Sequence, residues 1–224
     1  KEMRKLSSLT YLFLLMGLIL VFTSSCKKDD NNDDNTVTDV EGNVYKTVKI
    51  GSQIWMSENL RTTKYNDGTS ISNVTDAGEW SAITAGAYCN YKNTSNLDTI
   101  NTFGRLYNWY AVNTDKLAPK GWHVPTDTEW ATLTDFLGGE DVAGGKLKET
   151  GTTHWSSPNI GATNETGFTA LPGGGRGSNG NFYYIGLYGD WWSATQSTSN
   201  IWCRRIYYDG STVGRSSYIY KTFG

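Results

Sequence analysis

Residues 118–139 read APKGWHVPTDTEWATLTDFLGG and mark both ends of one helix. Thr126 and Glu129 have the spacing of a capping box, in which each side chain accepts a hydrogen bond from the other residue's main-chain N–H. Two glycines at the end of the stretch favour a helix stop. The pattern predicts a helix from Asp127 to Leu137 with one apolar face, formed by Trp130, Leu133 and Leu137.

Segments on either side of this helix are rich in β-forming residues. Asn43 to Ile50 and Gln53 to Met56 flank Gly51-Ser52, the residue pair that a type II′ hairpin turn requires. Ala87 to Lys92 has the composition of a strand, and so do four segments later in the chain. The later segments are Phe182 to Tyr188, Trp191 to Thr195, Ile201 to Tyr208 and Thr212 to Ser216.

Two further helices are expected between the early and late strands. Gly104 to Val112 carries apolar residues at helical spacing, and a short helix follows Gly145 in the segment KLKET. Strands, then helices, then strands indicate an α+β fold with mostly antiparallel strands and two main helices. No second linker or repeat interrupts residues 37–224, so we expect one domain there.

The N-terminal segment has the pattern of an export signal. Residues 1–25 contain a basic start and an eleven-residue apolar run, Leu12 to Phe22, which fits a signal peptide and is too short to span a bilayer as a helix. Small residues precede Cys26, as in a bacterial lipobox, where this cysteine would carry lipid. Residues 26–36 are polar and are expected to form a flexible tether. These features predict a lipid-anchored, exported protein. Lys27-Lys28-Asp29-Asp30, directly after the cysteine, resembles the export signals of Bacteroidetes surface lipoproteins, which implies a surface-exposed outer-membrane lipoprotein.

Composition limits the functions that the domain can have. The chain of 224 residues has 20 basic and 22 acidic residues and a net charge of −2, which argues against nucleic acid as a partner. Its 9 Trp, 14 Tyr and 7 Phe make aromatic rings the main large side chains. The only histidines, His123 and His154, lie in no zinc motif, and Gly173 to Gly177 lacks the rest of a phosphate-binding loop. We therefore expect no metal, no cofactor and no catalytic set.

Five motifs in a fixed order carry a resemblance to a known family. They are GSQIWMSENLRT, FGRLYNWYAV, the helix stretch quoted above, GFTALPGGGR and DWWSAT. Together they resemble the Fibrobacter succinogenes major paralogous domain, which occurs in lipoproteins and secreted proteins of Bacteroidetes and Fibrobacteres. This family is distantly similar to formylglycine-generating enzymes and to the C-type lectin-like fold. The resemblance implies a single C-type lectin-like domain over residues 37–224 that lacks a final strand bearing a cysteine.

The cysteines show whether the activity of formylglycine-generating enzymes is to be expected of this chain. Formylglycine-generating oxidases need a closely spaced cysteine pair late in the fold, and only Cys203 lies in that region. The oxidase activity is therefore not expected, although an enzyme of this kind or a glycan-processing enzyme remains the alternative function. Cys89 and Cys203 form a disulfide with each other, or Cys89 pairs with a cysteine of the missing strand, or both remain free.

The late aromatic residues are the candidates for ligand binding. Trp191 and Trp192 are adjacent on an expected strand, so their rings point to opposite faces and one can leave the core. Rings among polar side chains are typical of surfaces that bind carbohydrate or protein. The alternative is that these rings fill a core poor in Leu and Ile. The candidate set, which leaves the ligand and the oligomeric state open, is Trp191, Trp192, Trp202, Tyr183, Arg176 and Arg204.

Overall fold

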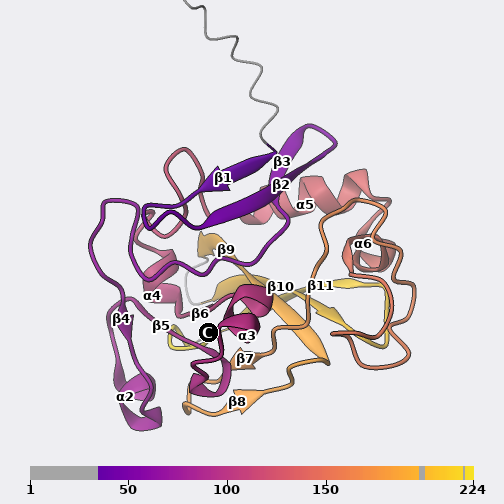
Figure 1. The fold of residues 1–224 in the computed structure, drawn as a ribbon. Coiled ribbons are helices and arrows are strands. Elements are labelled where there is room, and N and C mark those ends of the chain that lie inside the picture. The colour runs from indigo at the N-terminus through magenta and orange to yellow at the C-terminus, as the bar shows by residue number, and fades with distance from the viewer. Residues whose placement is uncertain (1–34, 197–199, 219) are drawn as a thin grey trace, which may run out of the picture. The chain divides into compact units, whose positions relative to one another are not determined.

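In the computed structural model, which describes residues 35–196, 200–218 and 220–224, helix α5 spans Asp127–Phe136 (Figure 1). The expected capping box is present: Glu129 N donates to Thr126 Oγ1 at 3.2 Å, and Thr126 N donates to Glu129 Oε2 at 2.8 Å. The predicted apolar face of this helix is buried. The segment predicted to be a signal peptide, residues 1–25, and Cys26 lie outside the described residues.

Helices and short sheets alternate along the described chain, which is an α+β fold. The other helices are α2 (Ala77–Ala82), α3 (Leu97–Phe103), α4 (Trp109–Val112) and α6 (Glu140–Leu147), with a 3-10 turn, η1, at Tyr91–Asn93. The shorter strands are β1 (Thr36–Thr38), β4 (Ser72–Asn73), β5 (Ala87–Cys89), β6 (Leu106–Tyr107), β7 (Gly175–Arg176) and β8 (Phe182–Tyr183). The longer strands are β2 (Val44–Ile50), β3 (Gln53–Met56), β9 (Tyr188–Gln196), β10 (Ile201–Tyr207) and β11 (Val213–Tyr218).

Antiparallel pairing dominates the sheets of the described residues. Strands β1, β2 and β3 form one sheet in that order, and β11, β10 and β9 form another. The β2–β3 turn contains Gly51 at φ +60°, as the predicted hairpin requires. The smaller sheets are β4–β5–β6, whose first pair is parallel, and β7–β8. In Figure 1, β9, β10 and β11 lie between the β1–β3 sheet with α5 and the β7–β8 pair.

Several sequence predictions of local structure were wrong in their bounds. The strand expected from Ala87 to Lys92 ends at Cys89, and the 3-10 turn η1 follows it. Gly104 to Val112 is not one helix, because Leu106 and Tyr107 pair with β5 and Asn108 then caps α4. The late strand expected from Phe182 to Tyr188 ends at Tyr183, because Tyr184 has φ +62°. At the N-terminal side, the expected tether ends before residue 36, since Thr36 already pairs with Lys46.

The helix expected after Gly145 begins earlier, at Glu140, and includes two glycines. A Cβ at Gly144 would lie 2.7 Å from the Ser211 carbonyl oxygen, and one at Gly145 would lie 2.4 Å from the Gly161 carbonyl oxygen. These glycines therefore sit within the helix because neighbouring main chain approaches it closely. Their helix-breaking tendency is outweighed by this packing.

Aromatic rings fill much of the interior. Trp55 and Trp130 pack with their ring centroids 4.8 Å apart, and Phe168 lies beside both. This cluster also contains Leu133, Leu147 and Trp155. A second cluster surrounds Trp109 and a third surrounds Trp80. The ring surplus seen in the sequence therefore supplies the hydrophobic core, as one of the two alternatives expected.

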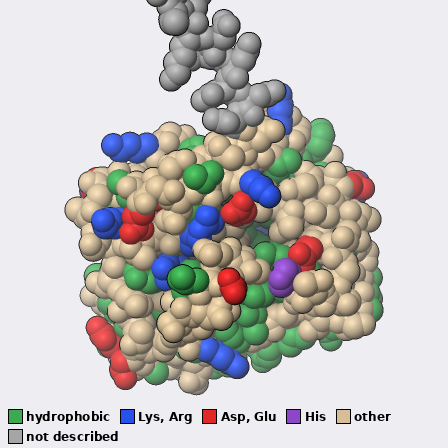
Figure 2. Space-filling model, in the orientation of Figure 1, with side chains coloured by type: hydrophobic (Ala, Val, Ile, Leu, Met, Phe, Trp, Pro, Cys, Tyr) green, Lys and Arg blue, Asp and Glu red, His purple; other side chains and the backbone are tan. Residues whose placement is uncertain are grey.

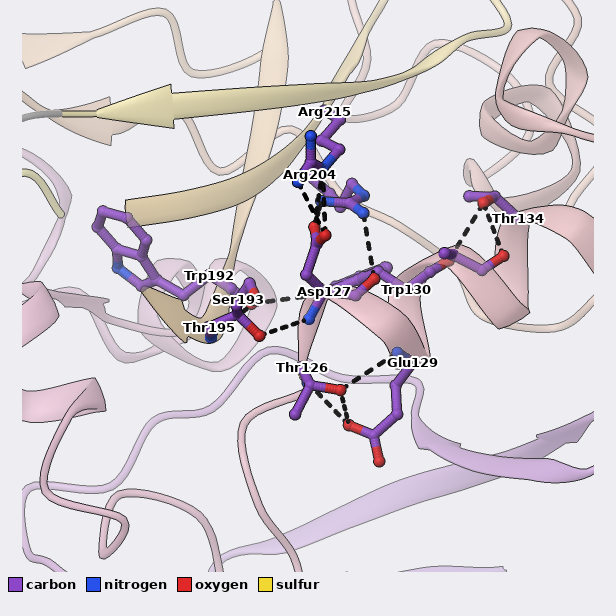
Figure 3. Close-up of polar contacts among 11 residues, drawn as sticks. Thr126, Asp127, Glu129, Trp130, Thr134, Trp192, Ser193, Thr195, Arg204 and Arg215 are labelled. Carbon is purple, nitrogen blue, oxygen red and sulfur yellow. Dashed lines mark hydrogen bonds and ion pairs between the residues drawn. The ribbon is translucent and has the colours of Figure 1, made fainter. Parts of the chain in front are cut away.

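The first turn of α5 is joined to the late sheet by polar contacts (Figure 3). The Asp127 carboxylate lies 2.8 Å from Arg204 Nη1 and 3.0 Å from Arg215 Nη2, and Asp127 N donates to Thr195 Oγ1. Burial raises the pKa of Asp127, but the hydrogen bonds from Arg215 and Arg204 outweigh it and hold the pKa below 3.8. These contacts fix α5 against β9, β10 and β11.

Lys148 is a buried cation that fastens the loop after α6. Its Nζ donates to the carbonyl oxygens of Ile160, Tyr207 and Gly210 at 2.8, 3.1 and 2.8 Å. The side chain is fully buried, and burial lowers its pKa to about 8.

Within the described ranges, no helix combines the length and the apolar character needed to cross a bilayer.

Candidate functional site

A pocket of about 840 Å³ lies where α5, β3, β9 and the segment before α5 meet. We call it the tryptophan pocket. Six large aromatic rings line its wall. The polar side chains that line it are mostly amides and hydroxyls, with a few charged groups among them. The rings belong to Trp55, Trp122, Trp130, Phe168, Trp191 and Trp192. A pocket of this size and composition falls in the range that proteins use for small-molecule ligands.

Three of these rings are held by hydrogen bonds within the protein. Trp191 Nε1 donates to Asn59 Oδ1 at 3.2 Å, and Trp192 Nε1 donates to the Tyr107 carbonyl oxygen at 2.8 Å. Trp130 Nε1 donates to the Trp192 carbonyl oxygen at 3.3 Å. Because their N–H groups are already bonded, the three rings have fixed positions. Trp191 and Trp192 are partly exposed and can offer carbon surface to a ligand, whereas Trp130 is only 2% exposed and packs behind the wall.

Trp55 differs from the other rings. It is 7% exposed, and its Nε1 has no hydrogen-bond partner among the described residues. A buried N–H without a partner is costly, by about 1–3 kcal/mol, so such groups are rare in folded proteins. The indole N–H of Trp55 is therefore buried without a partner in the part of the chain that the structure describes.

A histidine and a glutamate lie at the edge of the tryptophan pocket. His123 Nε2 is 2.9 Å from Glu129 Oε1, and Gln53 Nε2 donates to the Glu129 carbonyl oxygen. Glu129 also belongs to the capping box of α5. Burial raises the pKa of Glu129, but the hydrogen bonds from Thr126 and His123 outweigh this effect. The pKa of Glu129 therefore lies below its ordinary value of 4.5. The carboxylate is therefore ionised at neutral pH.

The structure brings together only two of the residues predicted to bind ligand. Trp191 and Trp192 both line the tryptophan pocket and are partly buried. They pack against different core clusters, Trp191 against the one around Trp55 and Trp192 against the one around Trp109. Trp202 lies elsewhere, with the Arg215 guanidinium 3.5 Å above its ring, and Tyr183 contacts Asn179 away from the pocket.

Arg176 and Arg204 are not placed on a ligand surface. Each is 1% exposed. Arg176 donates to the carbonyl oxygens of Gly180, Val74, Thr75 and Asp76 and stacks over Trp80. Arg204 faces Asp127 in the network of Figure 3. Both guanidinium groups hold segments of the interior together, a role that sequence cannot distinguish from ligand binding.

Cys89 and Cys203 are both free and buried, which is one of the three alternatives that the sequence left open. Cys89 lies in the cluster around Trp80, whereas Cys203 lies on β10 opposite Trp192. Burial raises the pKa of Cys89 to about 11 and raises that of Cys203 further. Neither thiol is therefore an activated nucleophile.

The sequence did not lead us to the pocket residues that precede β9 in the chain. Trp55, Asn59, Trp122 and Phe168 lie far from β9 in the chain, and only tertiary contacts bring them to Trp191. A usable signal was present, because Trp122 lies four residues before the capping-box residue Thr126, and Trp55 and Phe168 lie within two of the five motifs. Searching for ligand residues only in the late strands excluded them.

Charge on the surface is mixed. Figure 2 shows basic and acidic side chains interspersed with hydrophobic ones on one face of the molecule. In the part of the chain that the structure describes, no group of three or more His, Cys, Asp or Glu is placed to hold a metal ion.

Comparison with known proteins gives one result. The search of curated proteins and the search of solved structures found no match to the chain. A family model described as the Fibrobacter succinogenes major domain matches residues 48–223. The matched region contains every residue of the tryptophan pocket except Lys46 and spans well over half of the sequence. The chain therefore belongs to the Fibrobacter succinogenes major domain family.

Proposed function

We propose that this protein is a surface-exposed outer-membrane lipoprotein whose domain binds a carbohydrate in the tryptophan pocket without acting on it. The observation that carries the proposal is the set of rings whose own N–H groups fix them around a pocket of about 840 Å³. Fixed rings lose little conformational entropy when a ligand binds.

Carbohydrate fits this wall better than a charged or purely apolar ligand. A sugar ring has a face of C–H groups, which stacks on an aromatic ring, and an edge of hydroxyls, which needs hydrogen-bond partners. The pocket supplies both, with rings on its wall and Gln53, Asn101 and Thr102 among its polar positions. A protein ligand is the competing possibility and is included in the test below.

Two features support binding without catalysis. A glycosidase needs a general acid whose pKa is raised, whereas the pKa of Glu129 is lowered. The second carboxylate of the pocket, Glu58, accepts hydrogen bonds from Lys46 N and Arg61 Nη1 and so has a structural task. An oxidase of the formylglycine-generating kind is the alternative, but Cys89 and Cys203 lie in different surroundings and are not paired.

The anchor and the fold family are part of the same proposal. Cys26 follows an apolar run and small residues, so we propose lipid attachment there and export to the cell surface. We also propose that the α+β domain has a C-type lectin-like fold, because the family whose motifs it carries is distantly similar to proteins of that fold. Replacing Cys26 by Ala should move the protein from the membrane fraction to the soluble fraction and abolish palmitate labelling. Membrane fractionation that is unchanged by the substitution would contradict the anchor.

The binding claim is tested on an array of glycans and host proteins, with the full chain carrying Cys26→Ser to prevent lipidation. We expect binding to a subset of glycans, with each bound glycan recovered intact after prolonged incubation. Recovery of a cleaved or oxidised glycan would support the enzyme alternative. Binding to proteins only, or to nothing on the array, would overturn the carbohydrate proposal.

A further inference from the structure

A second, smaller pocket of about 170 Å³ adjoins the tryptophan pocket, and we call it the side pocket. The two share part of their walls, and the shared residues come from four separate segments of the chain. These residues are Asn59, Leu60, Val124, Leu171, Trp191 and Trp192. Six residues line both pockets, so the two pockets are adjacent in the fold.

Residues at the end of α3 and just after it also line the two pockets. Asn101 and Thr102 line the tryptophan pocket, whereas Phe103 and Arg105, which come next in the chain, line the side pocket. Phe223 also lines the side pocket, and its ring stacks on Tyr218 with the centroids 4.1 Å apart. The side pocket thus has an aromatic wall of its own.

The side pocket has a carboxylate of its own, that of Asp190. The Asp190 carboxylate accepts hydrogen bonds from Arg205 Nε at 2.6 Å and Arg205 Nη2 at 2.5 Å, and from the Tyr218 hydroxyl at 3.1 Å. Oδ1 receives only the first of these bonds among the described residues. A carboxylate oxygen can accept two, so Oδ1 retains capacity for a hydroxyl donor.

We infer that the two pockets form one extended site and that the ligand is an oligosaccharide with one sugar unit in the side pocket and the rest in the tryptophan pocket. The inference rests on the proposed carbohydrate function and adds the length of the ligand to it. The side pocket has room for one ring-sized group, and the tryptophan pocket has room for more than one. Trp191 and Trp192, which line both, stand at the junction between neighbouring units.

Length dependence of affinity is the measurable consequence. If two units bind at adjoining positions of one rigid site, the second adds contacts without a second loss of translational freedom, and affinity rises steeply. A ligand confined to the tryptophan pocket would gain little from units that extend into solvent.

The experiment is calorimetric titration of the full chain carrying Cys26→Ser with ladders of one to four sugar units. The probes are β-1,4-linked glucose, β-1,4-linked N-acetylglucosamine and α-1,2-linked mannose. Phe223→Ala alters the side pocket alone, and Trp122→Ala alters the tryptophan pocket alone. Gly173→Ala is a second side-pocket variant, because its Cβ meets nothing closer than 3.7 Å and so partly fills the space without a clash.

We expect the longer members of one ladder to bind the unaltered chain at least about tenfold more tightly than the monomer. Phe223→Ala and Gly173→Ala should remove this gain and leave monomer affinity unchanged, whereas Trp122→Ala should weaken all members alike. Equal affinity along a ladder that binds, or a gain that both side-pocket variants retain, would overturn the inference and leave the carbohydrate function standing. Absence of binding to every ladder would also overturn the inference, whereas the carbohydrate function is decided separately by the array.

Discussion

Trp191 and Trp192 are neighbours on β9, yet their indole N–H groups bond to different parts of the domain. The first donates to the Asn59 side chain at 3.2 Å and the second to the Tyr107 main chain at 2.8 Å. Each ring packs against a different core cluster and also lines the tryptophan pocket. Strand β9 therefore links core and pocket, and truncating either ring would change stability and binding together.

The capping box makes a measurable contribution to stability. Replacing Thr126 by Ala removes the hydroxyl that accepts from Glu129 N, so we expect the free energy of unfolding to fall by about 1 kcal/mol. Thr132→Ala is the control, because Thr132 is an exposed residue inside the same helix. Denaturant unfolding should show a change within about 0.5 kcal/mol for the control. Equal effects of the two substitutions would contradict the cap assignment.

Lys148 should be among the most sensitive positions of the domain. Lys148→Met keeps much of the apolar stem but removes the donors to three carbonyl oxygens. We expect a loss of about 3 kcal/mol, because buried acceptors without donors cost about 1–3 kcal/mol each. The matched control is Lys146→Met, whose ammonium makes only a surface ion pair with Glu165, worth about 1 kcal/mol or less. Thermal unfolding of both variants compares the two lysines directly.

Acid should weaken the contact between α5 and the late sheet. The folded pKa of Asp127 lies below its ordinary value of 3.8, so its contribution to stability is complete above that value. The contribution is lost as the pH falls through the folded pKa. Asp127→Asn should therefore destabilise the domain by about 2 kcal/mol at neutral pH, and the difference from the unaltered chain should shrink on acidification.

Asp135→Asn is the control for this pH dependence, since Asp135 is an exposed residue of the same helix and forms no ion pair with any residue that the structure describes. Its unfolding free energy should follow that of the unaltered chain at every pH. A difference between Asp127→Asn and the unaltered chain that stays constant from neutral to acidic pH would show that the ion pairs do not stabilise the fold.

The thiols of Cys89 and Cys203 should be protected and reduced. In the chain carrying Cys26→Ser, a thiol reagent should react with neither cysteine in the folded state, because both are buried and their pKa values are raised. After denaturation without reductant, two thiols per chain should react. A count of zero after denaturation would reveal a disulfide and contradict the free-thiol assignment.

Local sequence signals were reliable where they act through the main chain. The capping box at Thr126 and the turn at Gly51 depend on neighbouring residues alone, and both were found where expected. Segments whose conformation depends on distant partners were misjudged. Leu106 is in a strand because Cys89 pairs with it, and Gly144 is in a helix because the main chain at Ser211 approaches it.

The candidate site shows the same division. The sequence indicated that one of two adjacent tryptophans could leave the core, but it gave no means of placing Trp122 or Trp55 beside them. It also offered Arg176 and Arg204 as surface groups, although both satisfy main-chain or carboxylate acceptors in the interior. Long-range contacts decide which polar and aromatic side chains face a pocket, and spacing along the chain does not encode them.

The most direct test of the tryptophan pocket compares two tryptophans of similar exposure. Trp122 lines the pocket, whereas Trp202 lies under Arg215 and lines neither pocket. Calorimetric titration of Trp122→Ala and Trp202→Ala with the tightest-binding glycan of the array measures the role of each ring. We expect Trp122→Ala to weaken binding by about 2 kcal/mol or more while Trp202→Ala binds like the unaltered chain. Full binding by Trp122→Ala, or loss of binding by Trp202→Ala with its fold intact, would contradict the assignment of the ligand to the tryptophan pocket.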